Sequence, residues 1–258
     1  MTGVLLVCLL PGMTFAGGPD TVESLPTLDE AVKLALANNK GKSESDTLYE
    51  VKKYYYQLLA KKEQLGISDE VRGHFEKAVT KAQEKMESDE GEVTQSSVTK
   101  LKLGLSGTRN DISNFNADID IACLHLSHLL GKSITSEAPI PDEGLAPIAF
   151  PYETLDSFQK SQASSKPLKG MSRIKAEESL IQINKSREKL TLARQSRKIT
   201  RALLVTEVAN YDFGIGNEGD LFEALIIYTK VLVGYYDSIF QFNVDVLDFN
   251  RLMRELTA

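Results

Sequence analysis

The chain has 258 residues, of which 42% are hydrophobic and 26% charged, values that are ordinary for a folded protein. Its net charge of −6 gives no reason to expect nucleic acid or an anionic membrane surface as a partner. Residues 1–16, MTGVLLVCLLPGMTFA, have the short apolar core and small-residue end of a secretory signal. No apolar segment is long enough to cross a bilayer as a helix. We therefore expect an exported protein.

The first half of the chain predicts a short helix followed by a long helical hairpin. Thr27 with Glu30 forms a capping box at the start of an amphipathic helix over residues 28–38. Apolar residues then recur in steps of three and four over residues 48–86, and again over residues 98–129 after a polar turn. This rhythm indicates two antiparallel arms.

The middle of the chain changes character. Residues 132–167 contain several prolines and little periodicity, which predicts a connector with one short helix over residues 152–163. Residues 171–210 contain no Gly or Pro and have high helix propensity, with a thinner apolar pattern than the first hairpin. We expect another long helix there.

The strongest pattern lies in the last segment. Alternating steps of four and three continue for about five heptads, which puts the apolar residues on one stripe of a helix that supercoils with partners. Gly214, Gly216 and Gly219 predict the preceding turn, and Asp220 with Glu223 is expected to cap the helix. The seam comprises Leu221, Leu225, Tyr228, Leu232, Tyr235, Ile239, Phe242, Val246, Phe249, Met253 and Leu256.

The chain contains an internal repeat. A shift of 123 residues lays the turn at Gly91 on the turn at Gly214, and the apolar seam of residues 98–126 on that of residues 221–249. The predicted fold is all-α, with two tandem hairpins of long antiparallel helices in a coiled-coil bundle. We divide the chain into a signal (1–16), an N-terminal segment with a short helix (17–46), a first hairpin (47–131), a proline-rich connector (132–167) and a second hairpin (168–258).

Four segments resemble the TolC-like outer-membrane efflux proteins, and together they touch both repeats. In the last of them, the Tyr, Gly, Asp and Ala spacing of that family is matched by Tyr211, Gly214, Asp220 and Ala224. The segments are LPTLDEAVKLALANN, VKKYYYQLLAKKEQL, DIDIACLHLSHLLGK and ANYDFGIGNEGDLFEALIIYTKVLVGYY.

The resemblance implies a homotrimer whose long helices line a tunnel, working with a periplasmic adaptor protein and an inner-membrane pump. The chain departs from the family where each repeat should carry a pair of membrane strands. KGKSESDT, at residues 40–47, is too short for a pair that needs roughly 25 residues, and TLARQSRKITR, at residues 191–201, has no helix break. We therefore expect a TolC-like helical body without a β-barrel.

Three groups of residues are candidate sites. The turn before the last helix, Tyr211, Gly214, Ile215, Gly216, Asp220 and Leu221, corresponds by resemblance to the tip that gates the tunnel and docks the adaptor, and a plain connecting turn is the open alternative. The other tip is acidic, either selecting cations or keeping the tip solvated, with Glu87, Asp89, Glu90 and Glu92. A basic strip is either a solvated face or a docking strip or tunnel lining, with Lys185, Arg187, Arg194, Arg197 and Arg201.

No pattern points to an enzyme. His125 and His128 lie one helical turn apart, but a structural metal site needs four ligands and Cys123 projects from another face. We therefore predict no catalytic residues, no cofactor and no metal.

The family resemblance and the missing membrane strands lead to two expected functions. The first is a passive helical conduit and docking body in an envelope-spanning efflux or type I secretion system, located in the periplasm or outer membrane of a Gram-negative-type envelope. The alternative is a periplasmic helical scaffold or binding protein that has lost transport.

Overall fold

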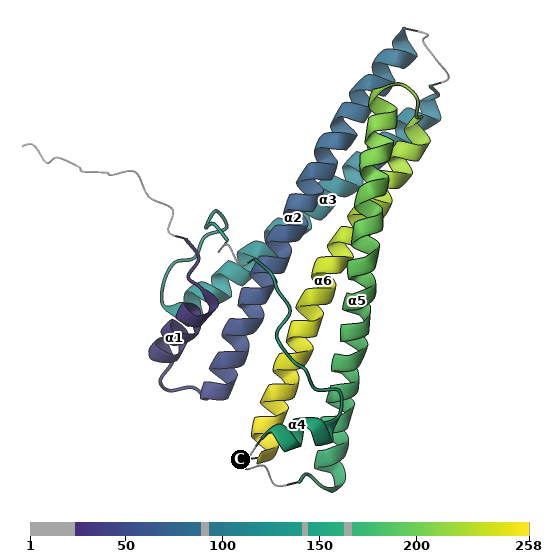
Figure 1. The fold of residues 1–258 in the computed structure, drawn as a ribbon. Helices are drawn as coiled ribbons and strands as arrows, with labels where there is room; N and C mark the ends of the chain where they lie inside the picture. The colour runs from purple at the N-terminus through teal and green to yellow at the C-terminus, as the bar shows by residue number, and fades with distance from the viewer. Residues whose placement is uncertain (1–23, 89–92, 141–143, 163–166, 258) are drawn as a thin grey trace, which may run out of the picture.

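The computed structural model describes residues 24–88, 93–140, 144–162 and 167–257, so the predicted signal lies outside the described residues (Figure 1). Within these ranges the chain forms helices joined by loops, with no strand. None of the helices described is both long and apolar enough to cross a membrane. The helices are α1 (Leu28–Asn38), α2 (Glu44–Glu87), α3 (Gln95–Leu130), α4 (Leu155–Ser161), α5 (Gly170–Asp212) and α6 (Glu218–Thr257).

The four long helices confirm the all-α prediction of two tandem antiparallel hairpins, α2 with α3 and α5 with α6 (Figure 1). Helix α2 packs mainly on α3 and α6, and α6 packs mainly on α2 and α5, whereas α3 and α5 do not contact each other. The helices therefore follow the order α3, α2, α6, α5. Helices α2 and α6 are internal, and α3 and α5 form the two edges.

Helix α6 buries the seam that its sequence predicts. Every member of the seam is buried except Tyr235 and Leu256, which are half-buried. Towards the tips the seam packs against apolar residues of α2 and α3, and towards the C-terminus it packs against α5, α4 and the connector. One stripe of α6 thus joins both hairpins, because burying apolar area is the main term that favours helix association in water.

The boundaries of α2 and α4 differ from prediction for the same reason. Helix α2 begins at Glu44, four residues earlier than expected, because the Ser43 side chain accepts the backbone N–H of Asp46 and caps a polar first turn. Helix α4 is shorter than expected and begins after a capping box formed by Thr154 and Ser157. In both cases a side-chain cap, not the apolar rhythm, sets the boundary.

Gly104 of α3 lies where a larger residue would meet the core. A Cβ placed there would be 2.6 Å from the Phe75 ring and 3.1 Å from Phe222, and Phe75 is fully buried. We expect Gly104→Ala to lower the free energy of unfolding by about 1 kcal/mol, because overpacking outweighs the better helix propensity of alanine. Urea unfolding followed by circular dichroism measures this change.

Gly66 of α2 provides the matched control. It is exposed, and a Cβ at that position would meet no atom within 4 Å. Gly66→Ala should therefore raise the free energy of unfolding by about 1 kcal/mol. The same sign of change in both variants would contradict the packing assigned to Gly104.

Candidate functional site

The turn between α5 and α6 is a compact backbone structure. Gly214 has a φ of 74°, a left-handed conformation that favours glycine. The carbonyl of Asn210 accepts the N–H groups of Ile215 and Gly216, both at 2.9 Å. A Cβ on Gly216 would lie 3.1 Å from the Cβ of Asn210. Gly214 is therefore favoured by its left-handed backbone conformation, and Gly216 is favoured because Asn210 leaves little room for a side chain.

Asn217, not Asp220, caps α6, which corrects the sequence prediction. Its Oδ1 accepts the N–H of Gly219 at 2.8 Å and that of Asp220 at 3.0 Å, and its Nδ2 donates to Asp220 Oδ2 at 2.7 Å. Because α6 begins at Glu218, Asp220 lies in the first helical turn. A carboxylate there still interacts favourably with the positive end of the helix dipole.

Tyr211 anchors this turn to the first hairpin. Its side chain is only 3% exposed, and its hydroxyl donates to the carbonyl of Ala78 in α2 at 3.3 Å. Lys81 Nζ donates to the carbonyls of Tyr211 at 2.8 Å and Asp212 at 3.0 Å, at the end of α5. The same lysine lies 4.8 Å from the Tyr211 ring centroid and Lys85 lies 5.2 Å from it.

A partly buried ion pair lies beside this anchor. Glu218 is only 7% exposed, and its Oε1 lies 3.6 Å from Lys85 Nζ. Burial, followed by the negative charge of Glu218, raises the pKa of the Tyr211 phenol well above its usual value. Tyr211 therefore remains a neutral hydrogen-bond donor, and α2 fixes the position of the turn.

The outer surface of the turn is apolar. Ile215 is 80% exposed and Phe213, which the sequence analysis did not select, is 81% exposed. Large apolar side chains so fully exposed at a fixed turn are typical of a contact site. Phe213 directly follows the last residue of α5, so the apolar seam of that helix has no position that would bury its side chain. This placement is the signal by which the sequence could have indicated an exposed Phe213.

The structure places only part of the acidic tip. Glu87 is exposed at the last position of α2. The other predicted members, Asp89, Glu90 and Glu92, lie outside the described residues. The acidic tip therefore stays a prediction.

The basic strip divides into three parts. Arg187 is half-buried, and its guanidinium donates to the carbonyls of Phe150 at 2.8 Å and Tyr152 at 3.0 Å, so that it holds the connector against α5. Lys185 is exposed and lies about half a helical turn away from Arg187 around α5. The remaining three members lie together along one groove: Arg194, Arg197 and Arg201.

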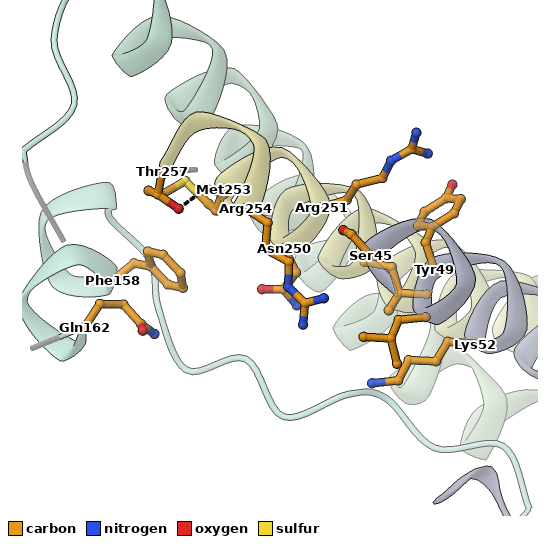
Figure 2. Close-up of a pocket in the computed structure, with 12 residues that line it drawn as sticks. Ser45, Tyr49, Lys52, Phe158, Gln162, Asn250, Arg251, Met253, Arg254 and Thr257 are labelled. Carbon is orange, nitrogen blue, oxygen red and sulfur yellow. Dashed lines mark hydrogen bonds between the residues drawn. The ribbon is translucent and has the colours of Figure 1, made fainter. Parts of the chain in front are cut away.

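A second cavity lies at the opposite end of the bundle from the tips. It encloses about 700 Å³ between the beginning of α2, α4 and the end of α6 (Figure 2). Arg251 borders it and pairs with Asp46 at 3.0 Å, with its guanidinium 5.1 Å from the Tyr49 ring centroid. Its apolar lining comes from Leu48, Phe158, Leu247 and Met253. These contacts hold the beginning of α2 against the end of α6.

The structure places His125 against an aromatic ring. His125 stacks on Tyr54 with ring centroids 4.0 Å apart and an interplanar angle of 6°. Among the residues that the structure describes, no group of three or more His, Cys, Asp or Glu side chains is arranged to hold a metal ion.

Comparison with known proteins identifies the fold. The outer-membrane channel OprN superposes with a TM-score of 0.63 at 10% identity, covering 88% of this chain and 70% of OprN. CusC, described as forming a transmembrane channel, gives 0.60 at 11%, covering 87% and 73%. A membrane protein from Pseudomonas aeruginosa gives 0.61 at 12%, covering 88% and 72%. The chain has the fold found in outer-membrane channels.

This likeness concerns the fold alone. No family model and no curated protein sequence matches the chain. Over most of its length the chain nevertheless follows the backbone of proteins described as channels or membrane proteins. The site at Tyr211 lies where one long helix turns into the next, at the end of the second hairpin (Figure 1).

Proposed function

We propose that the chain is a TolC-like component of an envelope-spanning efflux or type I secretion assembly, residing in the periplasm or at the outer membrane. Its helices form part of a passive conduit, and the turn at Tyr211–Leu221 contacts an adaptor through Phe213 and Ile215. The fold shared with outer-membrane channels supports this function. The exposed stripes along the two edge helices, α3 and α5, are the observation that carries it.

Helices α3 and α5 each expose a stripe of residues at heptad spacing. Each stripe lies on the face that points away from the neighbouring helix, α2 or α6 respectively. Small residues dominate the middle of the α3 stripe, and large aliphatic residues alternate with polar ones on α5. All members are exposed: Leu103, Gly107, Asn110, Asn114, Ala117, Ile121 and Leu124 on α3, and Ile174, Glu178, Ile181, Lys185, Glu188, Leu192, Gln195, Ile199, Ala202 and Thr206 on α5.

The directions of the edge helices allow the α3 edge of one copy to pack antiparallel to the α5 edge of another. Each helix in the order α3, α2, α6, α5 runs antiparallel to its neighbour, as the contacts of Asp46 with Arg251 and of Gln64 with Val233 show for α2 and α6. The α3 edge of one copy and the α5 edge of the next would continue this alternation. Such a head-to-tail contact closes into a ring when the rotation permits. A ring of three copies, as in the TolC-like family, would enclose a conduit.

The oligomeric state tests this function. We expect the full chain to form a closed oligomer in native mass spectrometry. Leu192→Asp and Ile121→Asp should each weaken association at least about tenfold, because each removes a buried aliphatic side chain from every interface. Gln182→Asp and Asn116→Asp are matched controls at exposed positions beside the stripes, and they should leave the oligomer intact.

The alternative function is a helical scaffold or binding protein that has lost transport. The charged residues Glu178, Lys185 and Glu188 within the α5 stripe favour it, because they are also typical of a solvated face. A native chain that stays monomeric, and that recovers neither an adaptor nor an inner-membrane pump after cross-linking, would establish the scaffold and overturn the conduit.

A further inference from the structure

A basic groove lies between α5 and α6 in the middle of the second hairpin. Its volume is about 1010 Å³, in the range of small-molecule sites. Four cations line it, together with aliphatic and aromatic surface: Arg194, Arg197, Lys198, Arg201, Val205 and Tyr235. We use the name basic groove for this site.

One arginine of the basic groove, Arg197, occupies a position that a coiled coil normally fills with an apolar residue. Leu190 and Leu204 are buried in the seam of α5 that faces α6. In steps of three and four from Leu190, that seam passes Ala193, Arg197 and the buried Thr200 before it reaches Leu204. Arg194 and Arg201 are exposed beside it. The opposing seam residue of α6 is Tyr235, which is only half-buried, unlike the buried residues on either side of it. The charged Arg197 on α5 and the half-buried Tyr235 on α6 both line the groove at this level of the seam.

The cations of the basic groove differ from other arginines of the chain in their ion pairs. Four other arginines of the chain, Arg72, Arg109, Arg173 and Arg251, pair with carboxylates at 2.8–3.3 Å. In contrast, no carboxylate of the described residues lies within ion-pair distance of any of the four cations in the groove. The guanidinium of Arg197 instead lies 4.9 Å from the ring centroid of Tyr235.

We propose that the basic groove binds an anionic amphiphile, a small molecule with a carboxylate, sulfate or sulfonate head and an apolar body. The guanidinium groups of Arg197 and Arg201 would hold the head by charge-assisted hydrogen bonds. Val205, which is 64% exposed, and the Tyr235 ring would cover the apolar body. The head of the ligand would supply the negative charge with which the cations of the groove could pair. Its body would supply apolar surface for Val205 and Tyr235. This inference concerns one chain and does not depend on a ring.

Isothermal titration calorimetry with laurate below its micellar concentration tests the proposal on the full chain. We expect saturable binding of laurate, and binding weaker by at least about tenfold for dodecyltrimethylammonium, which has the same chain and the opposite charge. Arg197→Gln with Arg201→Gln should weaken laurate binding by roughly thirtyfold or more, because removing each charge-assisted hydrogen bond weakens binding about five- to tenfold. Because neither arginine has a protein ion pair, this variant should keep its helical circular dichroism.

Lys185→Gln with Lys189→Gln is the matched control. It removes the same charge from exposed positions of α5 outside the basic groove and should leave laurate binding unchanged. Should the double arginine variant fail to fold, Arg194→Gln with Lys198→Gln removes two exposed cations of the same groove. Equal weakening by the lysine control, equal binding of the cationic amphiphile, or inorganic sulfate binding as tightly as laurate would each overturn the proposal. A monomeric chain that binds laurate in this pattern would sustain it while contradicting the conduit.

Discussion

Replacing Tyr211 with alanine is expected to lower the free energy of unfolding by about 3–5 kcal/mol, the usual cost of removing a buried aromatic ring. The ring is 3% exposed and joins the end of α5 to α2. Without it, the ammonium groups of Lys81 and Lys85 lose the aromatic face that they approach, and a cavity opens beneath the turn. Chemical denaturation followed by circular dichroism measures the global loss.

Tyr211→Phe separates the ring from its hydroxyl. It keeps the packing and the contacts of both lysines, and it removes the hydroxyl with its hydrogen bond to Ala78 and its interaction with Glu218. Its cost should be about 1 kcal/mol. Hydrogen exchange should show faster opening of the turn at residues 213–217 in the alanine variant and near-native protection in the phenylalanine variant. Equal destabilisation by both variants would contradict the anchoring role of the ring.

The sequence predicted most strongly the helix that has an unbroken apolar seam. Helix α6 keeps an unbroken seam because its apolar stripe faces α2, α3 and α5 along one side. Helix α2, which is internal like α6, is harder to interpret because its buried face includes the polar side chains of Thr47, Gln64 and Ser68. Gln64 is fully buried there, and its Nε2 donates to Val233 O at 3.1 Å and to Asp237 Oδ1 at 2.6 Å. Such a pairing across the two hairpins leaves no local pattern.

The sequence indicated where the turn and the charged segments lie along the chain better than it indicated what their side chains contact. The tip was found from its glycines, but the choice of Asn217 over Asp220 as the cap depends on where the first helical turn begins. The basic strip was found from its charges, yet only the three-dimensional course of the connector shows that Arg187 holds that segment. Charge and turn residues can be recognised locally, whereas the partners of a side chain depend on the tertiary fold.

Asn243→Leu is expected to lower the free energy of unfolding by about 2–3 kcal/mol and to release the connector from α6. Asn243 is fully buried; its Oδ1 accepts the N–H of Ile148 at 2.7 Å and its Nδ2 donates to the carbonyl of Ala146 at 2.9 Å. Leucine has a similar size but satisfies neither backbone group, so neither hydrogen bond can form.

Limited proteolysis within residues 144–154 gives a local measure of this change and denaturation a global one. Gln241→Ala is the control: this exposed residue of α6 bonds only to Asp245 in the described structure, and its loss should cost less than about 0.5 kcal/mol. If Asn243→Leu leaves the connector as resistant to protease as Gln241→Ala does, the apolar contacts of Phe150 with Phe158 and Phe249 hold that segment on their own. If cleavage accelerates as expected, the two hydrogen bonds of Asn243 are what order the connector. The segment between the two hairpins is then positioned by a polar contact on the same helix whose apolar seam joins them.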